Sequence, residues 1–259
     1  MFKEASLKEA RVMTLIKWAA MILLIVDHST IALFNNDPIG RTIGRLAFPL
    51  FAYMIAVGLQ YSTNTNKYLS RIIIFACISE IPFDMFVANV PFYFGSQNVL
   101  FTFVIAMGLY LLVKKFNFKV YLWLAAFVLG YALGEIFMVD YGGVGVITVL
   151  VFNLAMYGVK GDKLRAHFGQ ALGCATISFL YVALAYIEEG RLEFNIQIFA
   201  AFAFLILIFS SGGPAKFSKA SEKYSRLFYL VYPAQFIILW LCMYASGQRV
   251  LPTSLFWGF

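Results

Sequence analysis

Five ionisable residues lie deep inside apolar stretches of the chain: Asp27, His28, Arg45, Glu80 and Asp84. A charged side chain in such a stretch is costly unless it is paired or hydrated, so these positions are the first candidates for chemistry. Counted from Lys17 at about 1.5 Å per residue, Asp27 and His28 fall roughly 15 Å along a helix. Counted in the same way from Arg71, Glu80 falls about 14 Å along another. The two groups share a depth, and we expect them to meet.

His28 is the candidate for acid–base chemistry, because a histidine has a pKa of about 6.5 and can take or give a proton near neutral pH. Its neighbour Asp27 is about 100° away on a helix, so the partner of His28 must come from another segment. Glu80 is the best match in depth. Asp84 is second, four residues farther along the same helical face. Pro82 between them removes a helical hydrogen bond, which is typical of a helix that lines a cavity.

Arg45 has a side chain long enough to reach Asp84 or Asp27. A plainer interpretation of Asp27 is a packing ion pair with Arg45, and both interpretations stay open. A second polar group occupies the outer half of these stretches: Gln97, Asn98, Asp140 and Tyr141. Such side chains can hydrogen-bond a substrate that approaches from this side. Glu135 lies closer to the end of its apolar stretch and is expected to cap a helix. The three cysteines have no metal-ligand spacing, and no metal site is predicted.

The composition indicates that helices in a membrane position these residues. Of the 259 residues, 62% are apolar and 13% are charged, whereas soluble domains have about 25% charged residues. Spans of about 20 residues account for most of the chain and leave no room for a sizeable soluble domain. We therefore predict an all-α integral membrane protein, with residues 1–259 forming a single domain that is a polytopic bundle of about nine transmembrane helices.

The pattern of apolar runs predicts spans at residues 13–34, 43–62, 69–88, 98–113, 119–139, 143–159, 168–187, 194–210 and 228–246. Pro49 predicts an irregularity in the second span. Of the 20 lysines and arginines, 16 fall on one side of this arrangement, which puts the N-terminus inside the cell. The net charge of +7 comes from these scattered loop residues, which form no motif for nucleic acid and suit membrane lipid as a partner.

Six stretches of the chain form a recognisable combination in this order: LIKWAAMILLIVDH (15–28), IGRLAFPLFAYMIAVGL (43–59), KYLSRIIIFACISEIPFD (67–84), NVLFTFVIAMGL (98–109), DYGGVGVITVLVF (140–152) and, more weakly, YLVYPAQFIIL (229–239). Together they resemble the TraX family of bacterial membrane proteins. In the last stretch the family pattern leads us to expect a histidine where this chain has Gln235.

The resemblance implies a membrane acyltransferase of the bacterial cytoplasmic membrane that uses cytoplasmic acetyl-CoA, with His28 as its catalytic histidine. The family is named for a conjugal-transfer protein that acetylates the amino terminus of pilin. A pilin-like or other peptide amine, or a hydroxyl, is therefore the expected acceptor. The acetyl-CoA phosphates are expected to meet basic residues at the inner side: Lys67, Arg71, Lys114 and Lys115. One alternative is a proton-coupled transporter with an Asp–His–Glu relay. Another is a noncatalytic assembly factor.

Overall fold

A computed structural model describes residues 2–157, 162–190, 195–210 and 219–247. Within these ranges the chain is helical, and its only strand-like feature is a single bridge between Gln97 and Val139. The helices are α1 (Phe2–Leu33), α2 (Pro38–Gly44), α3 (Ala47–Tyr61), α4 (Thr65–Ala88), α5 (Val99–Lys115), α6 (Val120–Ile136), α7 (Gly142–Ala155), α8 (Lys163–Glu189), the 3₁₀ helix η1 (Ile196–Ala203), α9 (Phe204–Leu207) and α10 (Lys219–Ala245). The predicted all-α class is confirmed.

The helices fall where the apolar runs predict them, with four differences. Helix α1 begins at Phe2 and not near residue 13, and α10 begins at Lys219 and not near residue 228. A separate short helix, α2, covers the start of the second span, and the eighth span is mostly 3₁₀ helix. Two helical stretches, Pro38–Tyr61 and Lys163–Glu188, are long and apolar enough to cross a membrane by length and composition. Several other apolar helices in the described ranges are shorter, among them Val120–Ile136 and Tyr229–Ala245. The number of membrane spans therefore stays a prediction.

Polar side chains fix where several helices begin, because they satisfy amides that have no partner within the helix. Asp37 accepts hydrogen bonds from two amides in the first turn of α2, at 3.0 and 3.1 Å, and Pro38 suits the first helical position. Asn98 caps α5 in the same way. Glu135 accepts a hydrogen bond of 2.8 Å from the Gly143 amide at the start of α7, as expected of a cap.

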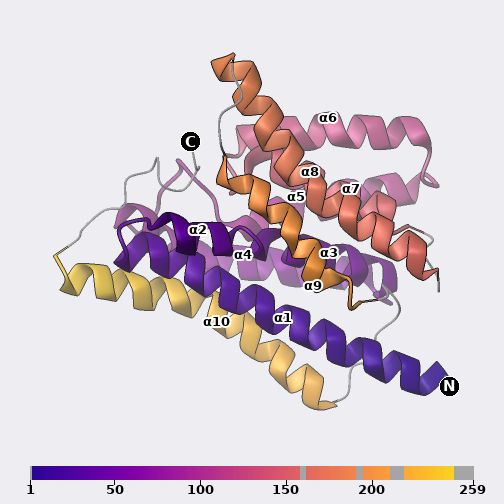
Figure 1. Ribbon diagram of the computed structural model, residues 1–259, viewed down its shortest axis with the longest axis horizontal. Coiled ribbons are helices and arrows are strands. Elements are labelled where there is room, and N and C mark those ends of the chain that lie inside the picture. The colour runs from indigo at the N-terminus through magenta and orange to yellow at the C-terminus, as the bar shows by residue number, and fades with distance from the viewer. Residues whose placement is uncertain (1, 158–161, 191–194, 211–218, 248–259) are drawn as a thin grey trace.

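Helix α3 occupies the middle of the bundle, where it packs against α1, α5, α7, α8 and η1 (Figure 1). Helix α10 runs beside α1 and also packs on α4, so the last described helix lies next to the first. The largest fully buried side chains include Tyr53, Phe86, Phe103, Phe152 and Phe236. The candidate site lies where α1, α3, α4 and α10 come together.

A buried polar cluster connects the N-terminal parts of α1 and α8 to α3 and to Ser210, three residues after the end of α9. The Tyr53 hydroxyl lies 2.7 Å from the Ser210 hydroxyl, and the Gln170 amide donates to both residues at 3.1 and 3.0 Å. The Ser210 hydroxyl also donates to Glu9. Because these groups satisfy one another, we assign the cluster to holding the helices together and not to a ligand.

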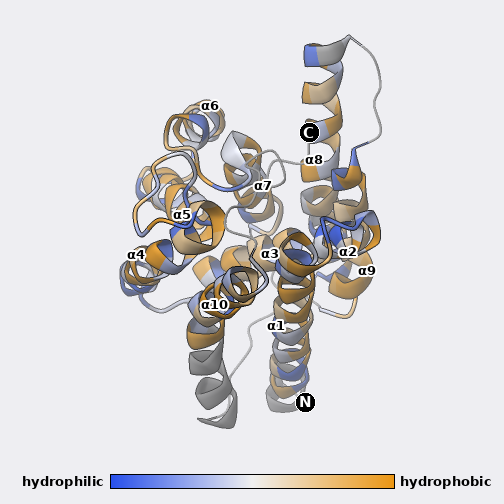
Figure 2. Cartoon of the chain, turned by 90° about the vertical axis from the view of Figure 1, so that its left-hand side faces the viewer, coloured by the Kyte–Doolittle hydropathy of each residue, from blue (hydrophilic) through white to orange (hydrophobic). Residues whose placement is uncertain are grey.

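Large apolar side chains also cover surfaces that face away from the bundle. Examples on α1, α6 and α8 are Leu15, Val128 and Phe179, with exposed fractions of 68%, 71% and 70%. Figure 2 shows that apolar residues are spread along the helices throughout the molecule. Monomeric proteins in water rarely expose large contiguous apolar surfaces, so this surface is of the kind that lipid or a partner covers.

Candidate functional site

Asp27 lies on the face of α1 that meets α2, and two arginines hold its carboxylate. Nη2 of Arg45 is 2.7 Å from Oδ1 and 2.6 Å from Oδ2, and Nη1 of Arg41 is 2.8 Å from Oδ2. All three residues are buried. Of the two partners that the sequence left open for Arg45, the structure has Asp27 and not Asp84. The packing interpretation of Asp27 thus describes its observed contacts.

Two glycines, one turn apart, allow α2 to approach α1 this closely. A Cβ atom at Gly44 would overlap the side chain of Asp27, and one at Gly40 would overlap Thr30. Small residues spaced by four let two helix backbones come together, as they do in membrane helix pairs. The ion pair therefore depends on both the arginines and the glycines of α2.

His28 lies on the adjoining face of α1, against α4 and α10. The centroid of its ring is 4.9 Å from that of Phe236 and 5.8 Å from that of Phe86. Its Nδ1 atom is buried and has no hydrogen-bond partner among the described residues. A small space of about 30 Å³, lined by both His28 and Asp27, adjoins the ring. This volume is close to the share of one water molecule in the liquid.

The two carboxylates of α4 bond to groups other than His28. Oε2 of Glu80 accepts hydrogen bonds from the side-chain amide of Asn98 and from its backbone amide, the latter at 3.2 Å. Oδ2 of Asp84 accepts one of 2.9 Å from the Tyr93 amide. These bonds tie α4 to the start of α5 and to the loop before it. The expected pairing of Glu80 or Asp84 with His28 is therefore absent among the described residues, because equal depth does not fix how each helix is rotated.

Two of the outer polar residues, Asp140 and Tyr141, lie beside the ion pair of Asp27 and Arg45 at the small space. Asp140 and Tyr141 line this space together with Arg45, whose guanidinium carbon is 5.9 Å from the centroid of the Tyr141 ring. The Asp140 amide donates a hydrogen bond of 2.8 Å to the Gln97 carbonyl, which anchors the loop between α6 and α7. Burial raises the pKa of the Asp140 carboxyl to about 6, although Arg45 acts in the opposite direction. Asn98 is buried and committed to Glu80 and to its capping role.

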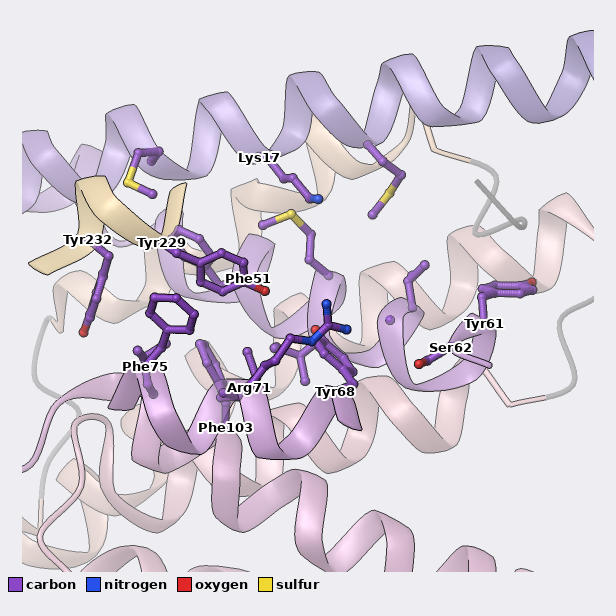
Figure 3. Close-up of a pocket in the computed structure, with 18 of the residues that line it drawn as sticks. Lys17, Phe51, Tyr61, Ser62, Tyr68, Arg71, Phe75, Phe103, Tyr229 and Tyr232 are labelled. Atoms are coloured by element: carbon purple, nitrogen blue, oxygen red, sulfur yellow. The ribbon is translucent and has the colours of Figure 1, made fainter. Parts of the chain in front are cut away.

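A cavity of about 690 Å³ lies between α1, α3, α4 and α10. Figure 3 shows Lys17 of α1 and Arg71 of α4 pointing into it from opposite walls. Phe51 and Tyr232 line both this cavity and the small space beside His28, so these two side chains separate the two volumes. The cavity thus extends from basic side chains to two side chains that also border the space beside His28, while His28 itself does not line it.

Of the four basic residues expected to meet the donor phosphates, Arg71 lines the cavity. Lys67, at the start of α4, and Lys114 and Lys115, at the end of α5, are not among the residues that line it. The site thus brings together Arg71 and the His28 region and leaves the other three lysines outside.

Two basic residues of the site were missed from the sequence. Lys17 precedes His28 by eleven residues, close to three helical turns, so the two share one face of α1. Arg41 precedes Arg45 by four residues, which places both guanidinium groups on one face of a helix. Both spacings are visible in the sequence.

Comparison with known proteins agrees with the resemblance noted from the motifs. Residues 12–243 match the family described as TraX protein. A "Probable fimbrial assembly protein FimC" from Dichelobacter nodosus is 28% identical over 247 residues, which cover 86% of this chain and 92% of that protein. No solved structure gives a significant match. Since the matched range takes in most of the chain and every candidate site residue, the chain belongs to the TraX family.

Proposed function

We propose that this protein is a membrane-embedded acyltransferase that moves an acetyl group from acetyl-CoA to the amino group of a pilin-like peptide. The observation that carries the proposal is the cavity of about 690 Å³, which extends from Lys17 and Arg71 to Phe51 and Tyr232, two side chains that also border the small space beside His28. A thioester donor with an anionic head and a long, largely apolar arm matches this distribution of charge. Family membership and the fimbrial assembly relative support a pilin-related acceptor.

Placement in a membrane is supported by the apolar outward surfaces and by the two helical stretches long enough to span a bilayer. A multi-pass location in the bacterial cytoplasmic membrane accounts for both. It also puts the open, basic part of the cavity at the cytoplasmic side, where acetyl-CoA is found, if the N-terminus is inside as the loop charges predict.

The donor phosphates would bind Lys17 and Arg71, whose side chains face each other across the cavity. Eleven residues along α1 from Lys17 to His28 correspond to about 16 Å. The pantetheine arm would follow this wall of the cavity and bring the thioester to Phe51 and Tyr232. Lys67 adds positive charge near the same end of α4, whereas Lys114 and Lys115 have no part in this arrangement.

The acceptor amine would enter beside Asp140 and Tyr141, where a carboxylate can hold an ammonium group before that group releases one proton to water. The neutral amine nitrogen then bonds to the thioester carbonyl carbon while the carbon–sulfur bond breaks. His28 takes one of the two protons left on nitrogen and gives it to the departing thiolate, so the products are an amide that keeps one N–H and the CoA thiol. Arg45, fixed by Asp27, supplies positive charge near the oxygen that becomes negative.

The chain contains two histidines, which gives the experiment a matched control. Purified protein in lipid nanodiscs is incubated with radiolabelled acetyl-CoA and a peptide that has a free, apolar amino-terminal segment. We expect His28→Gln to abolish labelling of the peptide and His167→Gln to retain it, because His167 lies against Gln170 at the start of α8. Equal labelling by the two variants, or none by the parent protein, would refute the proposal.

The transporter alternative requires its acids and histidine to pass a proton along. Asp27 bonds to Arg41 and Arg45, and the two carboxylates of α4 bond to Asn98 and to the Tyr93 amide. These separate partners do not link the acids into a hydrogen-bonded chain within the described residues. No contact in the site therefore favours the relay over the acyltransferase.

A further inference from the structure

The buried side chains of His28 and Gln235 lie next to each other, and each has polar atoms that lack a hydrogen bond. Nδ1 of His28 has no hydrogen-bond partner among the described residues, and the same is true of both Oε1 and Nε2 of Gln235. Gln235 is 5% exposed and contacts the histidine ring from α10. Buried polar atoms that lack a bond cost about 1–3 kcal/mol each, so an adjacent pair of them signals an interaction that a small side-chain rotation completes.

The surroundings of the ring limit what else could bond to Nδ1. Phe236 and Phe86 pack on the imidazole and offer no acceptor. The charged groups and hydroxyls that line the small space or act on the ring are Asp27, Arg41, Arg45, Asp140, Tyr141 and Tyr232. Asp27 already bonds to two arginines, Asp140 accepts a hydrogen bond from the Tyr141 amide, and Tyr232 bonds to the backbone of Val99. Gln235 is the side chain within hydrogen-bonding reach of the imidazole, so its amide oxygen is the acceptor placed for Nδ1.

We infer that Gln235 is a positioning residue that fixes the tautomer of His28 by accepting a hydrogen bond from Nδ1–H through Oε1. The inference rests on the proposed function, because it assigns a role beside the proposed base. With the proton held on Nδ1, the free lone pair lies on Nε2, which is the nitrogen that would take the proton from the substrate. A neutral amide oxygen accepts from Nδ1–H both before and after Nε2 gains a proton, so the bond persists through the reaction. In the reverse orientation the amide NH₂ would donate to Nδ1. The imidazole proton would then be on Nε2, and that nitrogen could not accept a proton from the substrate.

The test reads the tautomer directly and does not require turnover. Protein labelled with ¹⁵N-histidine in nanodiscs, in a His167→Gln background, contains one labelled imidazole, and its two nitrogen shifts report which atom carries the proton. We expect Nδ1–H in the parent protein at neutral pH. Gln235→Met has a side chain of similar length without an acceptor and should lose this preference. Gln60→Met, a substitution of the same kind in α3, should keep it.

Two results would overturn the inference: an Nε2–H tautomer in the parent protein, or an unchanged tautomer in Gln235→Met. Gln235→Glu keeps an acceptor oxygen at the same place and should retain Nδ1–H, which separates loss of the bond from loss of packing. In the transfer assay we expect Gln235→Met to lower kcat roughly 10- to 100-fold with KM for acetyl-CoA unchanged, and Gln235→Glu to recover most of the loss. Absence of acetyl transfer in every form would refute the proposed function, whereas the spectrum would still decide the role of Gln235.

Discussion

Replacing Asp27 with asparagine tests whether a buried ion pair holds α1 against α2. The substitution keeps the shape of the side chain and one acceptor oxygen but removes the negative charge. In the parent protein one carboxylate lies between two guanidinium groups, with contacts of 2.6 and 2.7 Å to Arg45 and 2.8 Å to Arg41. The variant leaves two buried positive charges without this counter-charge.

The size of the effect follows from burial, since none of the three residues is more than 5% exposed. Removing one member of a buried pair typically costs about 3–5 kcal/mol, because the remaining charge stays out of water. At roughly 2–4 °C per kcal/mol for a chain of this size, the melting temperature should fall by about 10 °C. Arg41→Gln keeps both contacts between Arg45 and Asp27 and replaces the other guanidinium with a neutral amide. We therefore expect the free energy of unfolding to fall by no more than about 2 kcal/mol.

Thermal unfolding in one detergent measures the three proteins beside a matched control. Asp37→Asn makes the same chemical change at an exposed N-cap, where asparagine caps α2 as well as aspartate does, so its stability should equal that of the parent. The reasoning fails if Asp27→Asn unfolds within about 0.5 kcal/mol of Asp37→Asn, the scatter expected of surface substitutions. It fails equally if Arg41→Gln costs more than Asp27→Asn.

Three further outcomes are expected. Gly44→Ala should lower the melting temperature about as much as loss of the ion pair, since the added methyl group overlaps Asp27; calorimetry measures it. Arg71→Gln should raise KM for acetyl-CoA about tenfold with little change in kcat, and Lys114→Gln, which neutralises a residue outside the cavity, should leave both constants unchanged. Since the folded pKa of Asp140 is about 6 and its ordinary value is 3.8, the free energy of unfolding should fall as pH rises from about 4 to about 6. Asp140→Asn should remove that part of the pH dependence in unfolding curves.

The helices could be predicted because the length of an apolar run fixes where a helix can lie. Pro49 predicts an irregularity in the second span, because it has no amide hydrogen to donate to the Arg45 carbonyl, and the break between α2 and α3 falls at residues 45 and 46. A proline alone does not fix a break, since α4 and α10 continue through Pro82 and Pro233. The 3₁₀ form of η1 could not be predicted. Its sequence, IQIFAAFA, is compatible with an α-helix, and only its packing on α8 distinguishes the two.

The candidate residues of the site could be predicted from the sequence, but not which of them meet. Sequence counting placed Asp27, His28 and Glu80 at one level, whereas in the structure the α4 side chain that packs on the His28 ring is Phe86, and Glu80 bonds to Asn98. Which face of a helix points at which neighbour depends on how closely the backbones approach. That approach is set by small residues such as Gly44, whose role is visible only when the facing side chain is known.

The adjacency of Asp27 and His28 links the stability of the fold to the proposed chemistry. Because the two residues are consecutive, any rotation of α1 that turns one turns the other by the same angle. The bonds of Asp27 to Arg41 and Arg45 fix that rotation against α2, and they thereby direct His28 toward α10 and Gln235. A carboxylate that touches no substrate thus positions the base, so Asp27→Asn should lower acetyl transfer in step with stability, whereas loss of the Gln235 bond should lower transfer while the melting temperature changes little.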